Sequence, residues 1–268
     1  MTGLAEHIAD RDRWARGPRG PLALVNAQQV EVEQPVWPVP GRWAPAPGGL
    51  TVTAELGDGV VVDSVPVDGT VLVAGDHAVV PSVVSFSDGL AGTVTDRTLR
   101  VWDPSSEAIA RFAGIARFDH DATWVTSGRY EPVRDGLEAR GSVLDAAGVP
   151  LPVAGHVTTT VGDVAVRLVA VRSAAFRGSA RLQLIVQDAT SALPEDDPSS
   201  TYSMGRFLYL DDPGGPAEVV LDWNRAVLPP CAFSYLFACP VPPAENRIPA
   251  AIAAGERHPV DASGAVLH

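Results

Sequence analysis

Residues 50–73 read LTVTAELGDGVVVDSVPVDGTVLV, a run of largely alternating apolar and polar residues that two Asp-Gly pairs interrupt. Alternation with a period of two is typical of a strand with one buried face. Asp58-Gly59 and Asp68-Gly69 are hairpin signals, because glycine adopts positive φ without a steric penalty. The stretch therefore predicts short antiparallel strands joined by tight turns.

The same pattern recurs along most of the chain. A helical period is plausible only near residues 1–14, 105–112 and 250–256. Many short strands separated by turn signals are typical of a sandwich or a barrel. We therefore predict an all-β fold, mainly an antiparallel sandwich or barrel-like, with a short N-terminal helix and minor helical turns. The further expected strands are residues 93–102, 124–133, 138–144, 156–161, 163–173, 180–187, 207–210 and 219–223.

Three segments are expected. Residues 1–48 hold the N-terminal helix, which Thr2 would cap, and a proline-rich segment at 17–47 that we expect to be extended, irregular chain on a surface. Residues 49–118 form an N-terminal β-rich half, and residues 119–268 form a C-terminal β-rich half. Alternatively, the two halves make one continuous domain.

Composition excludes several classes of function. The chain has 268 residues, with 20 basic and 32 acidic side chains and a formal net charge of −12. This charge, with no basic run, argues against binding to nucleic acid or to an anionic membrane. No apolar stretch approaches the roughly 20 residues of a membrane-spanning helix. The N-terminus has no signal-peptide pattern, so we expect a cytoplasmic protein. Whether it forms a homo-oligomer stays open.

The common catalytic motifs are missing from the sequence. It has no glycine-rich phosphate loop, no dinucleotide fingerprint and no His-Glu-x-x-His pair, and no cofactor is identifiable. Residues 201–205 lack the first glycine of a nucleophile elbow, which argues against a serine hydrolase. Asp119-His120-Asp121 is interpreted as a turn or cap more readily than as a metal site. The acidic loop at 192–200 is either a solvated surface or a lid.

Residues 222–257 read DWNRAVLPPCAFSYLFACPVPPAENRIPAAIAAGER. The succession of Pro-Pro-Cys-Ala, Cys-Pro, Glu-Asn-Arg and Ala-Gly-Glu resembles a bacterial and archaeal family known as domain of unknown function 1684. Weaker similarity extends upstream through residues 100–114 and 188–208. Val227-Leu228 and Ser203-Met204 depart from the family pattern, which has Tyr-Asn and two glycines there. The resemblance implies a fold and the location of a site, and it implies no reaction.

The same segment supplies the candidate site. In extended chain, residues two apart share a face, so Asp222 lies with Asn224, and Glu245 lies with Arg247 opposite Asn246. We expect these side chains to converge, with two arginines anchoring an anionic ligand, Glu245 acting as acid or base and Asp222 orienting it. The expected ligand-binding residues are Arg206, Arg247, Asn224, Asn246 and Tyr202. Alternatively, the same polar network only pins a proline-rich tail that has few backbone hydrogen bonds.

Cys231 and Cys239 are the two cysteines of the chain. Three interpretations stay open for them: two separate buried thiols, a disulfide that closes the loop, or part of a metal site. Zinc would need two further ligands, such as His156 or His258, and no spacing motif supplies these. A metal bound through the cysteine pair is therefore not favoured.

Two functions follow from these patterns. The first is a small-molecule binding protein or enzyme for an anionic ligand, with its site where the Arg206 strand meets residues 222–247. The second is a non-catalytic interaction or structural module. The sequence does not decide whether the protein is an enzyme.

Overall fold

The computed structural model describes residues 3–133, 143–176 and 179–267. The chain divides into two compact units, Asp10–Arg111 and Met1–Ala9 with Phe112–His268; we call them the N-terminal and the C-terminal unit. The boundary near residue 118 that we expected lies inside the C-terminal unit. The proline-rich segment that we placed in a region of its own belongs to the N-terminal unit.

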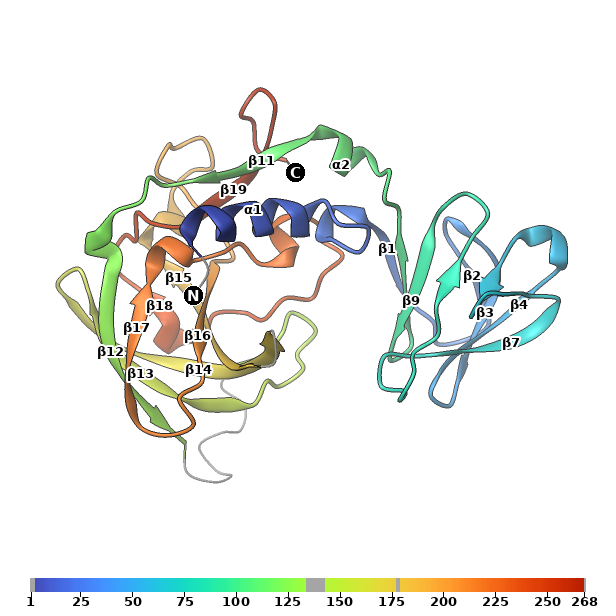
Figure 1. Ribbon diagram of the computed structural model, residues 1–268, viewed down its shortest axis with the longest axis horizontal. Helices are drawn as coiled ribbons and strands as arrows, with labels where there is room; N and C mark the ends of the chain where they lie inside the picture. Colours follow the sequence, from blue (N-terminus) through green and yellow to red (C-terminus); the bar gives the residue numbers. More distant parts are fainter. Residues whose placement is uncertain (1–2, 134–142, 177–178, 268) are drawn as a thin grey trace. The chain divides into compact units, whose positions relative to one another are not determined.

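The N-terminal unit consists of two antiparallel sheets around one core (Figure 1). Trp43, Leu50 and Leu99 are fully buried in that core. The first sheet has the order β1 (Leu24–Gln29), β10 (Thr98–Trp102), β9 (Ala91–Thr95), β8 (Val84–Ser85), β5 (Val61–Val62) and β6 (Val65–Pro66). The second has the order β2 (Gln34–Val36), β3 (Val39–Ala46), β4 (Gly49–Ala54) and β7 (Gly69–Ala74).

Residues 50–73 form short antiparallel strands as predicted, but the two Asp-Gly pairs do not close hairpins. β4 pairs with β7 and β5 pairs with β6, so Asp58-Gly59 and Asp68-Gly69 lie in connections between the two sheets, and Asp63-Ser64 is the tight turn of the β5–β6 hairpin. Gly59 and Gly69 do adopt positive φ, at 70° and 104°. The prediction of irregular chain at 17–47 was wrong, because β1, β2 and β3 pair into sheets there. Several of these prolines lie at strand ends or in strands with one unpaired side, where proline costs no ladder hydrogen bond.

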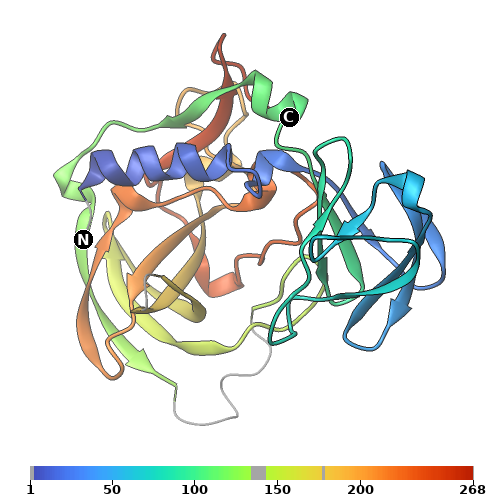
Figure 2. The ribbon, with the colours of Figure 1, turned by 45° about the vertical axis from the view of Figure 1, so that its right-hand side comes forward.

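The C-terminal unit is built on one strongly curved antiparallel sheet, a half-barrel whose curvature both ribbon views show (Figure 1 and Figure 2). Its concave core contains Leu168, Leu184, Leu208 and Trp223, all nearly or fully buried. The strand order is β16 (Arg206–Asp211), β15 (Ser179–Asp188), β14 (Val164–Phe176), β13 (Val153–Val161), β12 (Val125–Pro132) and β17 (Ala217–Asp222). The fold is therefore all-β and mainly antiparallel, as predicted.

The signature segment crosses this half-barrel in short 3-10 helices and extended chain. The short helices are Trp223–Arg225, Pro230–Ala232 and Ala244–Asn246. They are followed by β18 (Arg247–Ile248), which pairs in parallel with β15, and by β19 (Glu256–Asp261), which pairs with β11 (Phe112–Arg117). The helix considered at 250–256 does not form, since backbone carbonyls there accept hydrogen bonds from a side chain instead.

The α-helices are α1 (Leu4–Ala15) and α2 (Glu107–Arg111), in agreement with the predicted short N-terminal helix and the helical period near 105–112. The expected cap Thr2 lies outside the described residues, as does most of the strand expected at 138–144. Within the described part of the chain, no helix combines the length and the apolar character needed to cross a membrane.

Candidate functional site

Arg206, the expected anion anchor, is 1% exposed and lies at the start of β16. Its Nη2 donates to Asp188 Oδ2 at 2.6 Å and to the Ile252 carbonyl at 2.9 Å. Its Nη1 donates to the carbonyls of Ala254 and Glu256. The guanidinium therefore ties the chain before β19 to the end of β15, and its charge is compensated inside the protein.

Asp188 completes this cluster from the end of β15. Its Oδ1 accepts hydrogen bonds from Thr190 N, Thr190 Oγ1 and Ile252 N at 3.0, 2.6 and 3.0 Å. Burial alone raises the pKa of Asp188, but Arg206 and these hydrogen bonds outweigh it and hold the pKa below the ordinary value. Asp188 is thus an ionised carboxylate with a full set of partners.

Asn246 is fully buried and bridges two strands of the half-barrel. Its Nδ2 donates to the carbonyls of Val169 and Ile185, both at 2.9 Å, and its Oδ1 accepts from Val169 N at 2.7 Å. Val169 belongs to β14 and Ile185 to β15. The β14–β15 register ends at Ala170 and Leu184, so the Asn246 side chain replaces the ladder hydrogen bonds that Val169 and Ile185 would otherwise make with each other.

Asp222 and Asn224 form a second polar cluster. Asn224 Nδ2 donates to Asp222 Oδ1 and to the Asp121 carbonyl, and its Oδ1 accepts from Asp121 N, each at 3.0 Å. Asp222 also pairs with Arg225 at 3.0 Å. Asp121 in turn caps the 3-10 helix Ala122–Trp124 by accepting from Thr123 N, which confirms the turn or cap interpretation of residues 119–121.

Glu245 and Arg247 are both exposed, on either side of the buried Asn246. Asn246 is thus separated from the two charges as expected, but Ala244–Asn246 is a 3-10 helix and not the extended chain that was assumed, and both charges point to solvent. The hydrogen bonds place Arg206, Asn224 and Asn246 in separate clusters, each occupied by protein groups. The expected convergence of these side chains on one ligand is not what the structure shows.

Tyr202 lies elsewhere, beside a cavity of about 460 Å³ in the C-terminal unit. It begins a tight turn in which Gly205 N donates to the Tyr202 carbonyl at 2.9 Å. Gly205 has a φ of +88°, and a Cβ there would lie 2.2 Å from the Val186 carbonyl oxygen. Glycine is therefore required at this position, and the turn that it permits presents Ser203 and Met204 to the cavity.

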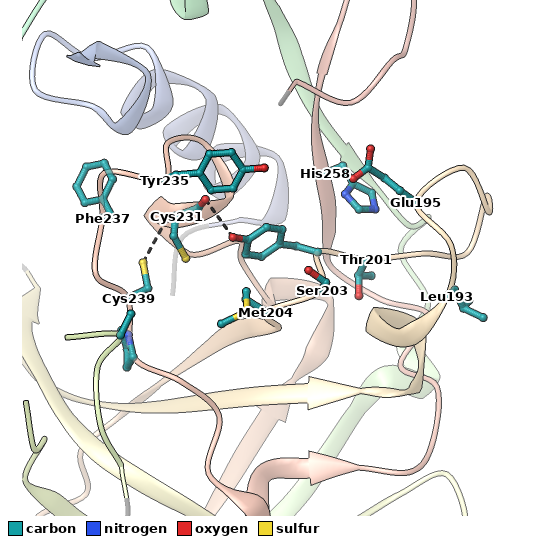
Figure 3. Close-up of a pocket in the computed structure, with 13 residues that line it drawn as sticks. Leu193, Glu195, Thr201, Ser203, Met204, Cys231, Tyr235, Phe237, Cys239 and His258 are labelled. Atoms are coloured by element: carbon teal, nitrogen blue, oxygen red, sulfur yellow. Dashed lines mark hydrogen bonds between the residues drawn. The ribbon is translucent and has the colours of Figure 1, made fainter. Parts of the chain in front are cut away.

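The cavity is shown in Figure 3, with the two cysteines at one end and Glu195 and His258 at the other. Its lining comes from Ala146, from residues 201–204, from residues 231–240, from His258 of β19 and from the acidic loop at 192–200. The residues that line it are Ala146, Leu193, Glu195, Thr201, Tyr202, Ser203, Met204, Cys231, Tyr235, Phe237, Cys239, Pro240 and His258. The loop that we considered as a possible lid thus contributes Leu193 and Glu195 to the wall.

Cys231 and Cys239 lie against one another at this cavity and are both free thiols. The backbone N–H of Cys231 donates to Cys239 Sγ at 3.2 Å, and the Tyr202 hydroxyl donates to the Cys231 carbonyl at 3.1 Å (Figure 3). The Cys239 carbonyl accepts from Ala146 N at 2.9 Å. The backbone around both sulfurs is therefore fixed by hydrogen bonds.

The two thiols differ in acidity. A hydrogen bond from the Cys239 thiol lowers the pKa of Cys231 against the opposing effect of burial, and the Tyr202 hydroxyl acts in the same direction. The same pairing with Cys231, together with burial, raises the pKa of Cys239. Burial and then the neighbouring Cys231 raise the pKa of Tyr202. The pKa of Cys231 is thus the lowest of the three, and those of Cys239 and Tyr202 are both raised.

At the other end of the cavity, His258 of β19 is 4% exposed. Its Nε2 lies 3.0 Å from Ser200 Oγ. Among the described residues there is no group of three His, Cys, Asp or Glu side chains placed to hold a metal ion.

Sequence reasoning identified Tyr202 and the two cysteines and named His258 as a possible zinc ligand, but it did not single out the apolar and aromatic residues of the cavity. Met204, Phe237 and Tyr235 are ordinary apolar or aromatic residues, and no spacing marks them as neighbours. The one available signal was Ser203-Met204, which stands where the resembling family has two glycines. Asp188, the partner of Arg206, was likewise visible only as part of a turn.

The family comparison covers residues 110–257, which match a family described as a protein of unknown function, DUF1684. Among solved structures, the chain is similar to an uncharacterized protein of Haloarcula marismortui determined by solution NMR. The two chains are 29% identical, with a TM-score of 0.43, over 55% of this chain and 77% of that one. No curated protein is similar enough to count as a relative.

The matched region spans more than half of the sequence and contains the half-barrel, the two buried polar clusters and both cysteines. The chain belongs to the DUF1684 family of proteins of unknown function.

Proposed function

We propose that the C-terminal unit binds a small, largely apolar molecule in the cavity beside Cys231. The observation that carries this proposal is the cavity itself, whose volume of about 460 Å³ falls within the roughly 300–1,000 Å³ range of ligand pockets. Protein groups do not fill it, in contrast to the surroundings of Arg206 and Asn246. The walls come from chain segments that are distant in sequence and are held by backbone hydrogen bonds.

The lining indicates the chemistry of the ligand. Leu193, Met204, Phe237 and Pro240 supply apolar surface, and Glu195 is the acidic group among the lining residues. No arginine is among them. An anionic ligand was the expectation from the sequence, but the Nη groups of Arg206 are already engaged with Asp188 and backbone carbonyls. A neutral molecule with an apolar body fits these walls better.

Ligand-observed NMR with a set of neutral aromatic and aliphatic fragments tests this proposal. Met204 is 44% exposed at the cavity, so Met204→Trp should fill space without disturbing the core. Val220, 57% exposed on β17 and not a lining residue, provides the control Val220→Trp. We expect fragments to bind the unmodified chain and Val220→Trp, and binding to Met204→Trp to weaken by at least about tenfold. Equal binding to all three proteins, or binding to none, would refute the proposal.

The second candidate is a non-catalytic interaction or structural module, in which the polar residues only hold the C-terminal segment. The side chains of Arg206 and Asn246 favour it, because each is buried and joined to backbone groups of the fold. The mass in solution, measured by size-exclusion chromatography with light scattering, separates the two. A stable oligomer that binds no fragment supports the interaction or structural module. A monomer that binds fragments supports ligand binding in the cavity.

A further inference from the structure

The two cysteines of the cavity differ from an ordinary pair of buried thiols in their surroundings. They are eight residues apart in sequence, and the Cys231 N–H contacts Cys239 Sγ at 3.2 Å. The cavity borders both sulfur-bearing residues, so a small molecule in it can reach them. Cys231 is 9% exposed and Cys239 is 8% exposed, which leaves access through the cavity and little elsewhere.

The surroundings of the two thiols give them different acidity. The Cys231 N–H donates to Cys239 Sγ and the Tyr202 hydroxyl donates to the Cys231 carbonyl, so the backbone holds the two thiols side by side at the cavity. Pairing with Cys239 lowers the pKa of Cys231 and the same pairing raises the pKa of Cys239, and the more acidic thiol is the better source of the nucleophilic thiolate. Cys239 keeps its proton while it acts as donor to Cys231. One nucleophilic sulfur and one protonated neighbour are the components of a dithiol that reacts in two steps.

We propose that Cys231 and Cys239 form a hydroperoxide-reducing dithiol, in which Cys231 attacks the peroxide and Cys239 resolves the product. This inference rests on the proposed function, because the cavity would hold the organic part of the hydroperoxide. It names the substrate class, and the experiment below separates failure of the dithiol from failure of the cavity.

In the first step the Cys231 thiolate attacks the terminal oxygen of the hydroperoxide, ROOH. A sulfur–oxygen bond forms and the oxygen–oxygen bond breaks. The alkoxide that leaves takes a proton from solvent and departs as the alcohol ROH. Cys231 becomes a sulfenic acid.

In the second step Cys239 attacks the sulfur of the sulfenic acid. A sulfur–sulfur bond forms, the sulfur–oxygen bond breaks, and hydroxide leaves with the thiol proton as water. The sum is one hydroperoxide and two thiols giving one alcohol, one water and one disulfide. The dithiol loses two electrons and the hydroperoxide gains them. A second turnover requires an external thiol reductant.

The electrostatics of the cavity favour a hydroperoxide over a charged disulfide as oxidant. Glu195 lines the cavity, no arginine does, and the chain carries a formal charge of −12. An anionic oxidant such as glutathione disulfide would be repelled, whereas a neutral hydroperoxide is not. The apolar side chains of Met204 and Phe237 can contact an organic group attached to it.

The test begins with the full-length reduced protein and one equivalent of cumene hydroperoxide, followed by intact mass and iodoacetamide labelling. We expect the mass to fall by two hydrogens and both thiols to become unreactive, and dithiothreitol should reverse both changes. Cys231→Ser should slow consumption of the peroxide by at least about 100-fold, because the remaining thiol is protonated. Cys239→Ser should instead stop at a sulfenic acid on Cys231 that dimedone traps.

Tyr202→Phe distinguishes a positioned thiolate from a merely accessible one. The groups that face Cys231 are Cys239 and Tyr202, with Tyr235 next to Tyr202, and Glu195 and His258 at the other end of the cavity. In the unmodified chain the reaction rate should rise with pH and reach half its limit below the roughly 8.5 of an ordinary thiol. Removing the hydroxyl should move that midpoint upward, while far-ultraviolet circular dichroism stays unchanged.

Two peroxides separate the dithiol from the cavity. Hydrogen peroxide needs no apolar contact, so Met204→Trp should slow its reaction by a smaller factor than the reaction of cumene hydroperoxide, and Val220→Trp should leave both rates unchanged. Cumene hydroperoxide should slow by at least about tenfold in Met204→Trp and not in Val220→Trp. If neither peroxide forms the disulfide, the dithiol inference is wrong even where fragments bind. If both peroxides form the disulfide and Met204→Trp changes neither rate, the dithiol inference is supported and the cavity does not bind the organic group.

Discussion

The Arg206 cluster and the Cys231 cavity lie in the same unit and both contain buried polar groups, yet their surroundings are opposite. Around Arg206, a carboxylate and three carbonyls accept from the two Nη atoms, and the space is filled with protein. Around Cys231, the polar groups contact one another and border a cavity of about 460 Å³. A buried polar group whose partners are all protein holds the fold together, whereas one beside open space is available to a ligand.

The largest expected effect is at Arg206. Replacing it by methionine keeps most of the side-chain volume but leaves the Asp188 carboxylate buried without a compensating charge. We expect Arg206→Met to lower the free energy of unfolding by about 3–5 kcal/mol, measured by urea denaturation. Arg225→Met is the matched control, because Arg225 and its partner Asp222 are partly exposed, and it should cost less than about 1 kcal/mol. Equal losses in the two variants would contradict the role given to Arg206.

The pH dependence of the same variant checks the cause. In the unmodified chain the pKa of Asp188 is lowered, so its contribution to stability is present above the ordinary carboxyl pKa of about 3.9 and is lost as pH falls through the folded value. Without Arg206, the largest influence that lowers this pKa is lost, so the pKa rises. The stability deficit of Arg206→Met should therefore be greatest near neutral pH and should shrink in acid. A deficit that is constant from neutral to acidic pH would point to lost packing.

The next effect is at Asn246. Asn246→Ala leaves the Val169 N–H and the carbonyls of Val169 and Ile185 without their side-chain partner in a fully buried place. We expect a loss of about 2–3 kcal/mol in thermal or urea unfolding, with no change in the rate of peroxide reaction per folded molecule. Asn224→Ala is the control, since Asn224 makes similar contacts to Asp121 at 9% exposure and should cost less. If Asn224→Ala lowers the free energy of unfolding by more than Asn246→Ala does, the depth of burial does not set the size of the loss.

The contrast between these regions also shows how far the sequence can be interpreted. Alternation at 50–73 is a local signal, and β4 and β7 follow it directly, whereas the Asp-Gly pairs connect the two sheets and close no hairpin. Alternation also separated Asn246 from Glu245 and Arg247, although Ala244–Asn246 is a 3-10 helix and not extended chain. It could not say which face points inward, because that depends on β14 and β15, which are more than 55 residues upstream. Arg206 has the residue type of an anion anchor, and only the folded chain shows that Asp188 already occupies it.

The cavity was harder still to predict. Cys231 and Tyr202 are 29 residues apart and meet because Gly205 permits the turn that begins at Tyr202. Met204 and Phe237 join them through the fold alone, and neither belongs to a motif. The difference in acidity between the two cysteines comes from their mutual hydrogen bond and from Tyr202, and spacing in the sequence does not encode it. Local pattern predicts elements, while the chemistry of this site depends on contacts between distant segments.

The smallest expected effect is at two residues that the sequence placed in the ligand site. Glu245 and Arg247 are exposed, and neither lines the cavity. Glu245→Ala and Arg247→Ala should each change the free energy of unfolding by less than about 0.5 kcal/mol and leave fragment binding and peroxide reaction unaltered. Chemical denaturation and the peroxide assay check both statements on the same samples. If folded Glu245→Ala protein no longer bound fragments, the ligand would have to contact Glu245 itself, and the binding site would not be the cavity. An exposed carboxylate that does not line the cavity can affect binding only by touching the ligand.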